Sequence, residues 1–121
     1  MGYASRLYVI NRIEHELPNG EKWVIGEEIG KINMCCMEMC FVDLFDTNID
    51  YKIIADDHNT EITKDEYGSD LQAAPIQRVI DWLEEYIADG AIYRRLKPLL
   101  GFLKGFDQSE WNYLEVVHYG E

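Results

Sequence analysis

The sequence predicts a single α+β domain, with a mostly antiparallel sheet and helices on one face of it. Three observations lead to this class: β-rich segments fill the first half of the chain, two helical patterns follow them, and one β-rich segment comes last. Strands that cluster before helices, rather than alternating with them, favour antiparallel pairing. The chain has 121 residues, enough for one core and too few for two, so we expect one domain over residues 1–121.

The first predicted element is a long β-hairpin. Residues 6–13 are strong β-formers throughout, and a turn-forming Leu-Pro-Asn-Gly sequence follows at residues 17–20. Residues 23–32 then continue as the second strand. Because glycine weakens a regular ladder, Gly26 and Gly30 within this strand predict a bulge or a bend.

The middle of the chain predicts a second, shorter hairpin. Residues 34–45 fit either a buried helix or an irregular segment, since a short apolar run does not reveal its own period. Residues 51–55 have a strand pattern, and residues 61–64 return antiparallel to them across a polar turn at residues 56–60. Residues 67–70 are expected to form the loop that leaves this hairpin.

Two helices and a closing strand complete the predicted order, β-β-β-β-α-α-β. The clearer helix follows Pro75, which suits a first helical position, and runs to Gly90, which suits the residue just past the end. A second helix is expected over residues 92–104, with Pro98 either in its first turn or at a kink, and residues 113–119 form the last strand. The apolar stripe of the first helix consists of Ile76, Val79, Ile80, Leu83 and Ile87.

Negative charge is concentrated in one part of the chain. Residues 38–70 hold ten acids against two lysines, which is a net charge of about −8 out of −12 for the whole chain. Such a balance argues against direct binding of DNA or RNA, because proteins bind nucleic acids largely through lysine and arginine side chains that neutralise the phosphates. It also disfavours anionic membrane surfaces. No apolar run approaches the roughly 20 residues of a membrane span, and no signal segment is evident, so we expect a cytoplasmic protein.

Two sets of acids have helical spacing. Within each set neighbours are three or four positions apart, so on a helix they would lie about 5–6 Å from one another. This distance is comparable to the spacing of phosphates along a nucleic acid strand, with a rise of about 3.4 Å per nucleotide. A carboxylate row can therefore imitate a phosphate row. The two sets are Asp43, Asp46 and Asp50, and Asp81, Glu85 and Asp89.

The leading functional hypothesis is a non-enzymatic interaction protein that needs no cofactor. Its acids would bind a basic groove on a partner protein, such as a nucleic-acid-binding protein, by electrostatic complementarity. The alternative is that the acidic faces are simply solvated. Besides the two helically spaced sets, the candidate contacts are Asp56, Asp57, Glu61, Asp65 and Glu66.

A soft-ligand cluster supports a second hypothesis, a small ligand- or metal-binding domain. Residues 34–40 hold all three cysteines and three of the four methionines, and thiolates with thioethers are the ligands that Cu(I) prefers. The same residues also suit an irregular core or a soft contact surface. No CxxC pair supports the metal interpretation, and the close spacing of the cysteines favours free thiols over a disulfide framework.

Two weaker possibilities concern other polar residues. The acids near residues 56–61 resemble a calcium loop, but a loop counted from Asp57 would need glycine and glutamate where Ile62 and Gly68 stand. An enzyme is the third hypothesis, with Cys36 or Cys40 as a nucleophile. The general base would be His58 or His118. Both are distant from the cysteines in sequence, so only the fold could bring one of them close.

Three short segments resemble small uncharacterised proteins encoded by phages and prophages. They are Met-Gly-Tyr-Ala-Ser-Arg-Leu-Tyr-Val at residues 1–9, Ala-Asp-Asp-His-Asn-Thr at residues 55–60 and Val-Val-His-Tyr-Gly at residues 116–120. The resemblance implies context rather than a site: many small acidic phage proteins inhibit host machinery, and anti-CRISPR proteins among them occupy nucleic-acid channels. No functional residue follows from it.

Overall fold

One curled sheet organises the chain. The computed structural model describes residues 4–35, 42–55, 60–90 and 95–120. Its strands are β1 (Ala4–Glu16), β2 (Lys22–Cys35), β3 (Thr47–Asn48), β4 (Lys52–Ala55), β5 (Thr60–Ile62), β6 (Gln72–Pro75) and β7 (Leu114–Gly120). Over these residues they form a seven-stranded sheet in the order β3-β6-β7-β1-β2-β4-β5. All neighbours pair antiparallel except β2 and β4, which are parallel. The predicted class is confirmed.

The long hairpin forms as the sequence predicts. β1 and β2 pair from end to end, and the register shifts between Val9, opposite Gly30, and Ile10, opposite Glu28. Ile29 is therefore the extra residue of a bulge beside one of the two glycines that predicted it. The second predicted hairpin is also confirmed, because β4 and β5 pair antiparallel.

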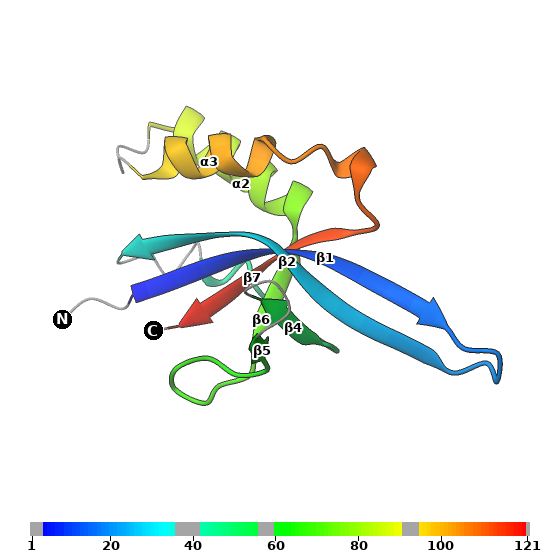
Figure 1. Cartoon of the computed structure of the whole chain (residues 1–121). Helices are drawn as coiled ribbons and strands as arrows, with labels where there is room; N and C mark the ends of the chain where they lie inside the picture. The colour runs from blue at the N-terminus through cyan, green and yellow to red at the C-terminus, as the bar shows by residue number, and fades with distance from the viewer. Residues whose placement is uncertain (1–3, 36–41, 56–59, 91–94, 121) are drawn as a thin grey trace.

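The far half of the long hairpin projects from the sheet as an arm (Figure 1). β7 pairs with β1 only over residues 5–11, and β4 pairs with β2 only over residues 25–27. Residues 13–24 consequently form a two-stranded ribbon. Leu17 and Trp23 on it are 43% and 52% exposed, and the Trp23 ring stacks on that of His15 at 5.5 Å.

Both helices cover one face of the sheet (Figure 1). They are α2 (Ile76–Ala88) and α3 (Leu96–Lys104), and a short 3-10 turn follows at Gln108–Glu110. Pro75 ends β6 and α2 follows it directly, as the sequence predicts. Gly90 has a φ of +95° just past the end of α2, as its position predicted. Pro98 lies in the first turn of α3, where the missing N–H costs nothing.

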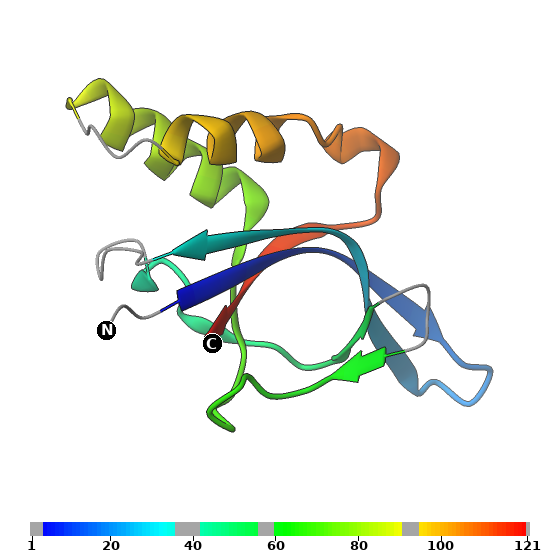
Figure 2. The ribbon, with the colours of Figure 1, turned by 60° about the vertical axis from the view of Figure 1, so that its left-hand side comes forward.

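A core lies on each face of the central strand. On the helix side, Leu7 and Val9 of β1 pack with apolar residues of both helices. On the other side, Tyr8 and Ile10 pack with Tyr51 and with residues of β4, β6 and β7. Figure 2 shows how the sheet curls, so that the chain from β3 to β4 passes on the side away from the helices.

Two strands were not predicted. β3 follows the segment that the sequence left open between helix and irregular structure, and β6 lies directly before α2. Residues 36–41 of the open segment lie outside the described residues. Both strands are too short to show an alternating pattern, with two and four residues.

The close approach of a tyrosine ring to a glycine generates a prediction about stability. A Cβ on Gly26 would lie 2.4 Å from the ring of Tyr51 and 2.9 Å from a methyl group of Ile10. Because these neighbours belong to a packed core, Gly26→Ala should lower the free energy of unfolding by about 1–3 kcal/mol, measured by urea denaturation.

Gly101→Ala is the matched control. Gly101 lies within α3 with nothing within 4 Å of its added Cβ, so alanine should raise stability by about 0.5–1 kcal/mol through helix propensity. Equal effects of the two variants would contradict the packing argument.

Candidate functional site

The first of the two acid sets does not form a row. Asp43 lies in a turn, Thr47–Asn48 is strand β3, and Asp50 lies at a bend. The helical alignment expected for Asp43, Asp46 and Asp50 is therefore wrong. The strand pairing of Thr47 and Asn48 with β6 prevents it, because an extended chain does not stack positions three and four apart.

Several acids of the window are counterions of the chain's own bases. An Asp46 oxygen lies 3.2 Å from Arg78 Nη1, an Asp50 oxygen 2.8 Å from Arg12 Nη2, and a Glu61 oxygen 3.5 Å from Lys52 Nζ. Lys64 also pairs with Asp70. These pairs are largely exposed and contribute little stability, yet they partly neutralise the window.

Among the remaining acids of the window that the structure describes, Asp65 has a local role. Asp65 Oδ1 accepts the backbone N–H groups of Tyr67 and Ser69, both at 2.9 Å, which fixes the loop after β5. Glu66 is exposed beside it. Asp56 and Asp57 lie outside the described residues.

The second acid set does form a row. Asp81 and Glu85 lie one turn apart on α2, and Asp89 is the residue that caps its C-terminus. All three are exposed. Asp81 accepts a hydrogen bond from Gln77 Nε2 at 2.8 Å, and among the described residues neither Glu85 nor Asp89 makes an ion pair. The sequence placed this row correctly.

The acids do not share one face. α2 covers one side of the sheet, whereas Glu61 of β5 and Asp65 belong to segments beyond its other side, as Figure 1 shows. The curl of the sheet thus separates these acids of the window from the row on α2. Asp46 is an exception, because its pair with Arg78 brings it to the first turn of α2.

An open groove of about 570 Å³ accompanies the row on α2. Its described lining is Trp82, Glu85, Tyr86, Asp89 and Gly90, and we call it the α2 groove. The two aromatic rings stack with centroids 4.6 Å apart. Sequence reasoning used the acids of this helix but missed the aromatic pair. The signal was present, since aromatic residues four positions apart meet on a helix.

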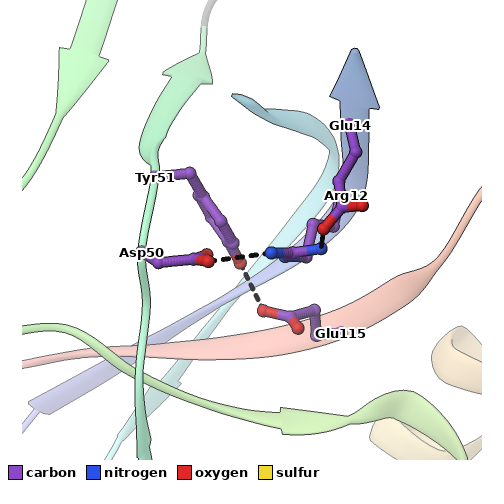
Figure 3. A network of polar contacts seen from close by, with 5 residues as sticks. All are labelled: Arg12, Glu14, Asp50, Tyr51 and Glu115. Carbon is purple, nitrogen blue, oxygen red and sulfur yellow. Dashed lines mark hydrogen bonds and ion pairs between the residues drawn. The ribbon is translucent and has the colours of Figure 1, made fainter. Parts of the chain in front are cut away.

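A polar network joins the other side of the sheet (Figure 3). Arg12 of β1 binds Asp50 at 2.8 Å and Glu14 at 2.5 Å, and the Tyr51 hydroxyl donates to Glu115 Oε2 of β7 at 2.5 Å. Its members are far apart in sequence, so no local pattern reveals it. Each of its three acids accepts a hydrogen bond within the network, which indicates a structural role.

Electrostatics differ between the two acids of this network. The hydrogen bond from Arg12 lowers the pKa of Asp50 below its ordinary 3.8. Burial raises the pKa of Glu115 above its ordinary 4.5, although the hydrogen bond from Tyr51 and the charge of Arg12 oppose the rise. Burial, together with the bond to Glu115, also raises the pKa of Tyr51.

The residues of the metal and enzyme hypotheses lie mostly outside the described chain. Met34 is buried in the helix-side core and Cys35 ends β2, but residues 36–40 and His58 are not described. His118 is partly buried with its ring 5.6 Å from that of Phe45, and burial lowers its pKa. Within the described ranges no group of three or more His, Cys, Asp or Glu could hold a metal ion.

Comparison with family models, with curated proteins and with solved structures found no match for this chain. The helices among the described residues include none that is long and apolar enough to cross a membrane.

The opposite pKa shifts in the network predict opposite pH dependence. Because folding raises the pKa of Glu115, its contribution to stability is complete below pH about 4.5 and is lost as the pH rises through the raised value. Glu115→Gln keeps an acceptor for the Tyr51 hydroxyl, and because glutamine does not titrate, the variant does not lose this stability as the pH rises. From pH 4 to 7 the variant should gain stability relative to the unmodified protein, measured by urea denaturation at each pH.

Asp50→Asn is the control of opposite sign. Since folding lowers the pKa of Asp50, its stabilising contribution is present above pH about 3.8 and disappears on acidification. This variant should lose stability relative to the unmodified protein as the pH rises from 3 to 6. A constant difference for Glu115→Gln at all pH values would show that Glu115 does not titrate differently on folding.

Proposed function

We propose that this protein is a non-enzymatic interaction protein that binds a basic, nucleic-acid-binding groove of a partner protein, and that the row on α2 is the contact. One observation carries the proposal. Asp81, Glu85 and Asp89 lie exposed along one helix without ion pairs among the described residues, whereas Asp46, Asp50 and Glu61 are matched to bases of the same chain.

An acid without a counterion has more to gain from a basic partner. A carboxylate that already has an arginine must exchange one ion pair for another, which changes the free energy little. Glu85 and Asp89 instead gain a new pair. Asp89 also lies where the helix dipole disfavours an anion by about 0.3–1 kcal/mol, and a bound cation would relieve this penalty.

The inhibitor class follows from the resemblance together with this charge pattern. A small protein with a net charge of −12 and a carboxylate row fits the phage proteins that block host nucleic-acid-binding machinery, as anti-CRISPR proteins do. We therefore place its action in the cytoplasm of a bacterial host. This protein would compete with nucleic acid for the basic groove of the partner, and it would not itself bind nucleic acid.

A charge-matched pair of variants tests the proposal. The α2 variant carries Asp81→Asn, Glu85→Gln and Asp89→Asn, and the control variant carries Asp46→Asn, Asp50→Asn and Glu61→Gln. Both remove three charges. Binding to a fluorescent oligolysine peptide, measured by anisotropy over a salt series, should weaken at least tenfold for the α2 variant and stay within about twofold for the control.

The second measurement uses proteins captured from a bacterial lysate on the unmodified protein. DNA should displace them, and the α2 variant should not retain them. Equal loss of peptide binding in both triple variants would show that only total charge matters. Unchanged binding and salt dependence in the α2 variant would overturn the proposal.

A further inference from the structure

The tip of the arm holds an asparagine that is followed directly by a glycine. Asn19 and Gly20 lie in the turn that joins β1 to β2, and both are exposed. We propose that Asn19 is a site of spontaneous deamidation, at which the chain itself converts the side-chain amide to a carboxylate. The inference is independent of the proposed function, because no residue of α2 takes part in it.

The reaction consumes water and needs no other co-reactant. Hydroxide takes the backbone N–H proton of Gly20, and the nitrogen attacks Asn19 Cγ. The new C–N bond closes a cyclic imide, the bond from Cγ to Nδ2 breaks, and Nδ2 takes a proton from water and leaves as ammonia, which regenerates the hydroxide. Water then opens the imide at Cγ to give aspartate, or at the main-chain carbonyl to give isoaspartate, whose backbone runs through the side chain.

Two features of the turn favour this attack. Gly20 has no Cβ, so no side chain hinders the approach of its nitrogen to Cγ. Asn19 Oδ1 accepts the backbone N–H of Glu21 at 3.0 Å, which holds the side chain against the backbone that follows it. The same N–H would stabilise the negative charge that develops on this oxygen during the attack.

One hydrogen bond restrains the reaction while the turn is closed. The N–H of Gly20 donates to the Leu17 carbonyl at 2.9 Å, so the nitrogen must be released before it reacts. The arm extends beyond the pairing with β7 and β4, and a two-stranded ribbon alone is marginally stable. Its turn therefore opens at a low cost in free energy, so folding should slow the reaction without preventing it.

The other asparagines of the chain are less reactive for two reasons. Each is followed by a residue with a side chain, which hinders the attack. Those that the structure describes are also held by strand pairing or by a side-chain hydrogen bond. They are Asn11 of β1, Asn33 of β2, Asn48 of β3 and Asn112, which bonds Asn11.

The isoaspartate product changes the arm. It lengthens the backbone of a turn that is closed by the bond from Leu17 N–H to the Glu21 carbonyl at 2.7 Å. The ring of Trp23, two residues further on, stacks on that of His15 across the ribbon. The new backbone length disturbs this closure, so deamidation should loosen the stack as well as add a negative charge to the tip.

Peptide mass spectrometry of the full-length protein, incubated in mildly alkaline buffer, tests the inference. The peptide with Asn19 should lose its amide at least about tenfold faster than any other asparagine-containing peptide, because a misplaced attacking atom lowers the rate of an intramolecular reaction steeply. The rate should rise with pH. In urea, where the turn is open, Asn19 should react about two- to tenfold faster than in the folded protein.

Gly20→Asp and Gly68→Asp provide the matched substitution. Both glycines are exposed with positive φ, +87° and +76°, which aspartate tolerates, and both variants add one charge. Gly20→Asp should slow the loss of the Asn19 amide about tenfold or more, and Gly68→Asp should leave it unchanged. The comparison is repeated in urea, so it does not depend on whether either variant folds.

Three results would overturn the site. They are equal rates at all asparagines, an intact Asn19 in the folded protein under conditions where the urea-unfolded chain reacts, and an unchanged rate in Gly20→Asp.

Discussion

The curled sheet depends on the contact between one tyrosine and the backbone of β2. Tyr51 packs where Gly26 has no side chain, and its hydroxyl donates to Glu115 on β7, two strands away in the sheet. The ring therefore connects the chain between β3 and β4 to two strands of the sheet. Beside it, Arg12 binds Asp50 and secures the same segment to β1. Tyr51 is also one of the buried residues of the core on the side away from the helices, where it packs with Tyr8 and Ile10 of β1.

The position of this segment also determines which acids of residues 38–70 are paired with basic side chains of the same chain. The segment that crosses beneath the sheet carries Asp50, and its neighbours in space supply Arg12 as the counterion. Glu61 meets Lys52 across the β4–β5 hairpin in the same way. The densest run of acids along the sequence is thus not the least neutralised surface of the folded protein. On the opposite face, Asp81, Glu85 and Asp89 make no ion pair with other described residues, although Glu84 of the same helix pairs with Lys104.

Local patterns predicted the local parts of the fold and failed where pairing joins distant segments. Both hairpins, the glycine-marked bulge and the end of α2 at Gly90 depend on residues close in sequence, and all of them form. The parallel pairing of β2 with β4 depends on how the chain returns beneath the sheet, which no periodicity encodes. Strand β3 has only Thr47 and Asn48, too few residues to alternate.

At the candidate site, too, the sequence predicted what depends on neighbouring residues and not what depends on distant ones. The number of acids in a stretch of sequence is therefore a poor guide to which acids can bind a partner. The row on α2 follows from i, i+4 spacing, and Trp82 and Tyr86 follow the same rule, so both parts of the groove were encoded locally. What the sequence could not supply is which acids already have partners, because Arg78 meets Asp46 from 32 positions away. A carboxylate contributes more to the affinity for a basic partner when no basic side chain of its own chain neutralises it after folding. Among the described residues Glu85 and Asp89 have no ion pair, so the row on α2, rather than the denser window at residues 38–70, holds the carboxylates whose charge the described part of the chain does not neutralise.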